Sequence, residues 1–148
     1  MGNVMVIILQ IIMSVTGTIA FAVTMKAPKD TLKYIAAGSI LSAATERILS
    51  LYTNDFFACL TSMIALSLFC EIIARIIKEP TTVIIMPSTI PLLPGSSIYY
   101  TMLYAIDGEK ELMLNYANAT LFAGLGIALG AVISSAAVKI FLTAVKKI

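Results

Sequence analysis

The sequence predicts an all-α polytopic membrane protein with about five transmembrane helices, in a single domain over residues 1–148. Three observations lead to this fold class: 59% of the 148 residues are hydrophobic, only 12% are charged, and the mean hydropathy is +0.99. Soluble domains carry about 25% charged residues, so a soluble fold is not favoured. The apolar residues also fall into runs of about 20, which is the length that crosses a bilayer.

Polar or helix-breaking residues bound each predicted span. The spans cover residues 4–25, 32–52, 56–77, 82–106 and 112–138. Lys26 and Pro28 end the first span, and Lys78 ends the third. The first 25 residues carry no charged side chain and are too long for the apolar core of a secretory signal, so we expect a retained first span.

The lysines and arginines predict the orientation of the chain. With five spans, one side holds Lys26, Lys29, Lys33, Arg75, Lys78, Lys139, Lys146 and Lys147. The other side holds Lys110, with Arg47 near that end of the second span. Basic residues favour the cytoplasm, which predicts an outside N-terminus and a cytoplasmic C-terminus. A four-span alternative with a re-entrant segment 80–106 would move the C-terminal lysines outside, so the charge bias disfavours it.

The fourth predicted span is interrupted. It contains Pro87, Pro91, Pro94 and Gly95. A proline removes a backbone donor and clashes with the carbonyl four residues earlier, so Pro91 should free the carbonyl of Pro87, and Pro94 that of Ile90. A new half-helix should begin near Ser96, with unpaired N–H groups at the bilayer midplane. Such a break is tolerated only inside protein or beside water, and many secondary transporters place a substrate site there.

The broken span therefore supplies the candidate substrate-binding residues. They are Pro91, Pro94, Gly95, Ser96, Ser97 and Tyr99. The N–H groups near Ser96 and Ser97 would hold an anionic group, the freed carbonyls would accept from an ammonium, and the hydroxyls would orient the ligand. The alternative is a proline kink that serves packing only. Three prolines and a Pro-Gly pair are more than a kink needs, which favours a site.

Two pairs of oppositely charged residues lie within the predicted spans. Glu46 and Arg47 are near the outer end of the second span, and adjacent helical positions point about 100° apart, so we expect no ion pair between them. Glu46 is a candidate for binding a proton or a substrate ammonium, or for an ion pair with another span. Arg47 lies close enough to the interface to snorkel. Glu71 and Arg75 have the spacing of a helical ion pair, which favours a structural over a gating role.

Small residues predict a close helix contact on the last span. Gly126, Gly130 and Ser134 repeat every four residues, and their partner is either another helix of this chain or a second chain. Cys59 and Cys70 both lie on the third span, about 16 Å apart, so we expect buried free thiols. The sequence shows no nucleophile–base pair, metal-ligand cluster, phosphate loop or basic nucleic-acid patch. It predicts neither an enzyme nor a cofactor.

Residues 90–100, Ile-Pro-Leu-Leu-Pro-Gly-Ser-Ser-Ile-Tyr-Tyr, resemble the Pro-x-x-Pro-Gly-x-x-x-Tyr segment of the threonine/serine exporter (ThrE) family. Residues 21–39 also resemble the C-terminal half of that family. Pro91, Pro94, Gly95 and Tyr99 are the positions that match the family motif.

The family includes fused proteins that carry both halves and split pairs of subunits. The resemblance therefore implies the small subunit of a split pair, working with a larger membrane subunit as one half of an inverted-repeat secondary transporter. It implies export of threonine and serine across the plasma membrane of a prokaryote. Two alternatives stay open: export of small dicarboxylates such as succinate, and a non-transporting regulatory or scaffold subunit.

Overall fold

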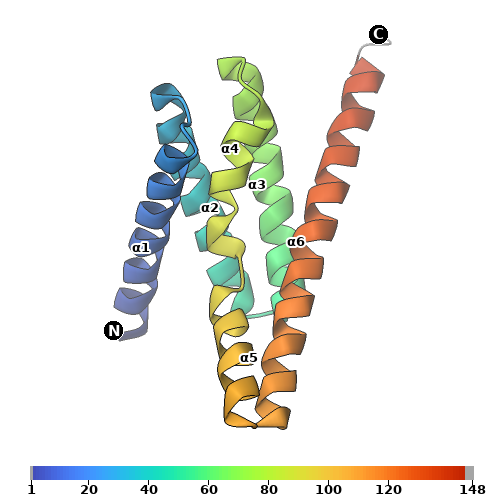
Figure 1. Cartoon of the computed structure of the whole chain (residues 1–148). Helices are drawn as coiled ribbons and strands as arrows, with labels where there is room; N and C mark the ends of the chain where they lie inside the picture. Colours follow the sequence, from blue (N-terminus) through green and yellow to red (C-terminus); the bar gives the residue numbers. More distant parts are fainter. Residues whose placement is uncertain (1, 146–148) are drawn as a thin grey trace.

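The computed structural model describes residues 2–145, and this range is helical throughout, with no strand (Figure 1). The α-helices are α1 (Gly2–Thr24), α2 (Leu32–Ser50), α3 (Asp55–Ile77), α4 (Thr81–Ser88), α5 (Gly95–Asp107) and α6 (Lys110–Val145). Two short 3-10 helices, η1 (Lys29–Thr31) and η2 (Ile90–Leu92), lie in the connections. The all-helical prediction is confirmed.

Fewer helices meet the length and composition of a membrane span than the five that the sequence predicts. Among the described residues, α3 and α6 are long and apolar enough to cross a membrane. The segment from α4 through η2 to α5 is bent at a break, and it makes a third span if its two parts are counted as one. The apolar stretch of α1 within that range is shorter, at Ile8–Thr24. α2 carries three charged residues, Lys33, Glu46 and Arg47, which lower its hydropathy. The structure thus supports two or three spans, and five spans remain a prediction.

The core lies where α2, α3 and α4 meet. The fully buried side chains there include Ile35 of α2, Leu66 and Cys70 of α3, and Ile84 of α4. α1 packs on α2 at one side of the molecule, and α6 packs on α3 at the other (Figure 1). The α5–α6 hairpin extends beyond the turn that joins α2 to α3, so its tip is separate from this core (Figure 1).

The small residues of α6 lie against α3 of the same chain. An added Cβ at Gly126 would be 2.6 Å from the carbonyl oxygen of Phe56, and one at Gly130 would be 2.8 Å from that of Leu60. Ser134 is buried on the same face. Of the two partners left open by the sequence, the structure therefore shows the contact within the chain. This close approach fixes the position of the first turns of α3 along α6.

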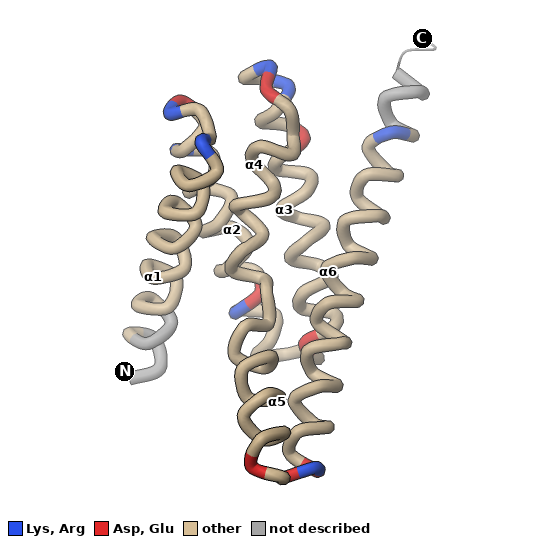
Figure 2. The backbone as a smooth tube through the Cα atoms, in the orientation of Figure 1, with Lys and Arg blue, Asp and Glu red and all other residues tan. Residues whose placement is uncertain are grey.

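Charged positions gather at the ends of the helices, with an apolar middle (Figure 2). One end holds the turns after α1 and α3, which carry Lys26 and Lys78. The exception is an acidic and basic pair on α2 beside the break between α4 and α5 (Figure 2). Lys146 and Lys147, which contribute to the predicted orientation, lie outside the described residues.

Candidate functional site

The fourth predicted span is broken at the Pro-Gly pair. α4 ends at Ser88, η2 follows, and α5 begins at Gly95, one residue earlier than expected. The two parts are bent by 51°. Pro94 is the N-cap of α5 and has no N–H to donate, so the chain cannot continue as one helix.

The backbone of the break leaves two N–H groups unpaired, whereas one of the carbonyls expected to be free is paired. The expectation that Pro94 frees the carbonyl of Ile90 is wrong, because this oxygen accepts from the N–H of Leu93 at 3.1 Å. The carbonyl of Leu93 in turn accepts from the N–H of Gly95 at 2.8 Å. No acceptor within the described residues pairs with the N–H groups of Ser96 and Ser97. These two donors are the unpaired groups of the α5 N-terminus.

α2 holds the chain in place just before the break. The hydroxyl of Ser42 donates to the carbonyl of Ser88 at 3.0 Å, and the hydroxyl of Ser88 donates to the carbonyl of Ile35 at 3.2 Å. Gly38 allows this approach, because an added Cβ there would lie 2.8 Å from the Ser88 hydroxyl oxygen. These two hydrogen bonds fix the end of α4 against α2, and they thereby fix the direction in which the chain continues into η2.

A polar pocket of about 220 Å³ opens at the break. It joins the loop before α5 to the end of α2, the start of α3 and the first half of α6. Its lining residues are Glu46, Arg47, Asp55, Cys59, Pro91, Leu92, Leu93, Pro94, Ser96, Ser97, Ala119 and Ala123. The structure thus brings Glu46 and Arg47 together with four of the six predicted substrate-binding residues.

The pocket lies toward one end of α2 and α3 and not at the middle of these helices. Asp55 is the first residue of α3, and Arg47 is in the last turn of α2. The break is central within its own segment but level with one end of α2 and α3 (Figure 1). The physical reason is the long α5–α6 hairpin, which carries the second half of the segment past the ends of these helices.

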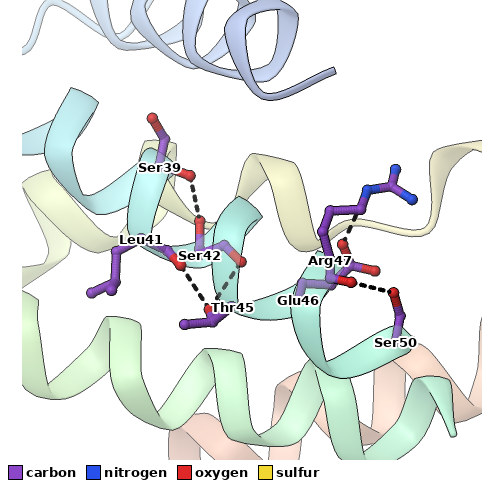
Figure 3. A network of polar contacts seen from close by, with 7 residues as sticks. All are labelled: Ser39, Leu41, Ser42, Thr45, Glu46, Arg47 and Ser50. Carbon is purple, nitrogen blue, oxygen red and sulfur yellow. Dashed lines mark hydrogen bonds and ion pairs between the residues drawn. The ribbon is translucent and has the colours of Figure 1, made fainter. Parts of the chain in front are cut away.

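Glu46 and Arg47 form an ion pair, contrary to the expectation from their positions on the helix. The Arg47 Nε lies 3.4 Å from Glu46 Oε2. Both side chains are long enough to bend toward each other from adjacent positions, as Figure 3 shows. The Arg47 guanidinium extends away from α2, whereas the hydroxyls of Ser42 and Thr45 on the same helix donate to backbone carbonyls (Figure 3).

Four of the predicted binding and ion-pair residues lie outside the pocket. Tyr99 is 62% exposed and packs edge-on against Tyr100, with ring centroids 5.4 Å apart. Glu71 and Arg75 form the ion pair that their spacing predicts, at 3.5 Å, near the opposite end of α3. Gly95 lies between two lining residues, and an added Cβ there would meet nothing within 4 Å.

Sequence reasoning missed six lining residues: Asp55, Cys59, Leu92, Leu93, Ala119 and Ala123. Leu92 and Leu93 lie inside the Pro-x-x-Pro segment itself. Asp55 looks like a turn residue, and Cys59 is buried and free like Cys70. One signal could have found the alanines, since they extend the small-residue face of α6 toward its N-terminus. No local pattern links Asp55 to Pro94. The described residues contain no group of three or more His, Cys, Asp or Glu side chains that could hold a metal ion.

Comparison with known families identifies the chain. The family model described as threonine/serine exporter, ThrE, matches residues 10–137, which include every lining residue of the pocket. No curated protein and no solved structure matches the sequence. Because the family match covers most of the chain, this protein belongs to the threonine/serine exporter (ThrE) family.

Proposed function

We propose that this protein is the small membrane subunit of a secondary exporter of threonine and serine, and that the pocket at the α4–α5 break binds the substrate. The observation that carries the proposal is the composition of the pocket. It combines unpaired N–H groups at a helix N-terminus with two carboxylates and a guanidinium, in a chain of the exporter family.

These groups match the chemistry of a small zwitterion. The substrate carboxylate would accept from the N–H groups of Ser96 and Ser97, at a helix end that carries about half a positive charge. The substrate ammonium would lie against Glu46 or Asp55. The volume of about 220 Å³ is below the roughly 300–1,000 Å³ of pockets for drug-sized ligands, as suits a small amino acid.

The charges of the pocket favour an amino acid over a dicarboxylate. Glu46 and Asp55 bring two carboxylates, and Arg47 brings one guanidinium that is already paired with Glu46. A dianion such as succinate would meet like charges at close range, which is unfavourable. The pocket also argues against a purely regulatory or scaffold subunit, for which we expect the break to be filled by side chains.

A second, larger membrane subunit would complete the transporter. The α5–α6 hairpin has exposed apolar side chains, among them Tyr99, Met102 and Ile106, which lie outside the core of this chain. In our proposal the partner half covers part of this surface, and rocking between the halves opens the pocket to each side in turn. The distribution of lysines supports an outside N-terminus and a cytoplasmic C-terminus in the plasma membrane.

Site-directed labelling tests the pocket assignment. In a chain with Cys59→Ala and Cys70→Ala, the variant Ser97→Cys should react with a membrane-impermeant maleimide, and threonine should slow this reaction. The matched control is Glu109→Cys, an exposed position in the turn between α5 and α6 that does not line the pocket, where labelling should occur and threonine should have no effect. Equal protection at both positions, or no labelling of Ser97→Cys in a correctly inserted protein, would contradict the assignment.

A further inference from the structure

A second cavity, of about 390 Å³, lies at the opposite end of α4 from the break. It is a groove between the end of α1, the turn that follows it and the start of α4. Its lining residues are Met25, Lys26, Ala27, Pro28, Thr82, Val83, Met86 and Pro87. None of them lines the pocket at the break, so the groove is a separate feature.

The walls of the groove are apolar and accessible, and its rim is basic. Met25 and Met86 are 53% and 59% exposed, so this surface is open to the surroundings of the bundle. Lys26 lies at the groove, Lys29 follows in the same connection and Lys33 in the first turn of α2, against one carboxylate among these residues, Asp30. The local charge is therefore positive.

The backbone at the rim is unusual. Lys26 has φ 57°, and Lys78, which ends α3 at the same end of the bundle, has φ 58°. They are the two non-glycine residues of the described chain with positive φ. Helices commonly end with glycine in this conformation, because a Cβ makes it unfavourable. Here a lysine occupies the position at the groove, which places an ammonium beside an apolar wall.

We propose that this groove binds an anionic phospholipid. The acyl chain would lie against Met25, Val83 and Met86, and the Lys26 ammonium would pair with the phosphate group. Basic pockets between membrane helices at the cytoplasmic surface recognise acidic headgroups in this way. The predicted orientation places this lysine-rich end in the cytoplasmic leaflet, where such lipids are abundant. The site is independent of the proposed transport activity.

The absence of tryptophan from the sequence allows a direct test. In the purified, reconstituted chain, Met86→Trp places a single fluorophore in the groove, and brominated lipids quench it on contact. In phosphatidylcholine vesicles, brominated phosphatidylglycerol should quench at about fivefold lower mole fraction than brominated phosphatidylcholine, as expected for one lysine. The control Leu129→Trp, at an exposed α6 position outside the groove, should show no preference.

Two lysine variants separate the charge from the fold. Lys26→Gly suits the positive φ, so the protein should fold while the preference for phosphatidylglycerol is lost. Lys78→Gly makes the same change in the same backbone conformation outside the groove, and the preference should remain. Equal quenching by both lipids, or a preference that survives Lys26→Gly, would overturn the proposal. Protection of the tryptophan from both lipids by the partner subunit would assign the groove to a protein contact instead.

Discussion

The contact between α3 and α6 gives the sharpest prediction, because two glycines of one helix differ in their surroundings. An added Cβ at Gly126 would lie 2.6 Å from the backbone oxygen of Phe56 and 3.2 Å from the Cβ of Cys59. Backbone cannot move aside as a flexible side chain can. At Gly124, on another face of α6, an added Cβ would meet nothing within 4 Å. The same substitution should therefore have opposite effects at the two positions.

The expected magnitude follows from two contributions. Glycine to alanine in a helix interior gains about 0.5–1 kcal/mol from backbone entropy, and this gain applies to both positions. Overpacking costs about 1–3 kcal/mol, and it applies only to Gly126→Ala. The entropic gain cancels in the difference, so Gly126→Ala should be less stable than Gly124→Ala by about 1–3 kcal/mol.

The assay is the free energy of unfolding in detergent micelles, from the loss of helical circular dichroism on titration with dodecyl sulfate. Since Cys59 lines the pocket and touches the Gly126 position, substrate protection of Ser97→Cys should weaken in the Gly126→Ala variant as well. Equal stability of Gly124→Ala and Gly126→Ala would refute the close approach of α3 and α6, and with it the geometry of the pocket.

Three further predictions concern the break and its supports. Gly95→Leu should insert and assemble, because a Cβ there meets nothing within 4 Å, but should abolish export, because it places a bulky side chain between the lining residues Pro94 and Ser96; near wild-type export would contradict the site. Gly38→Ala should cost about 1–3 kcal/mol of unfolding free energy. Adding Ser88→Ala should recover part of this loss, because it removes the hydroxyl oxygen that the new Cβ would meet at 2.8 Å. The recovery should be incomplete, because the contact with the Ser88 Cβ at 3.2 Å remains; no recovery would argue against the close approach of Ser88 to Gly38. A small thiol reagent should modify Cys59, which lines the pocket, and not Cys70, which is fully buried; the reverse order would place the pocket elsewhere.

The sequence predicts the helical elements well, because charge, proline and glycine mark their ends. The predicted break coincides with the observed one, since Pro94 cannot donate within a helix. The Glu71–Arg75 pair is also predictable, as it depends only on spacing within one helix. The length of α6 is less so, because the predicted span ends at residue 138, before Lys139, whereas the helix runs from Lys110 to Val145.

The pocket could be predicted only in part, because it depends on contacts between distant segments. Asp55 and Pro94 line the same pocket because α3 and α5 both pack against α6, which no local pattern encodes. The position of the break relative to α2 and α3 could not be predicted for the same reason: it depends on the stagger of the α5–α6 hairpin relative to these helices. Its place at the bilayer midplane stays a prediction. The backbone directions at positions 46 and 47 do not predict the Glu46–Arg47 pair, because long side chains can converge from adjacent positions.

Transport by inverted membrane vesicles tests the central claim most directly. Vesicles would contain this chain alone, the larger membrane subunit alone, or both, and uptake of labelled threonine, serine and succinate would be measured. We expect uptake of threonine and serine only with both subunits, and loss of that uptake with Gly95→Leu. Uptake of succinate in place of the amino acids would contradict the substrate assignment. No uptake of any of the three, with both subunits correctly inserted, would contradict the transport function itself.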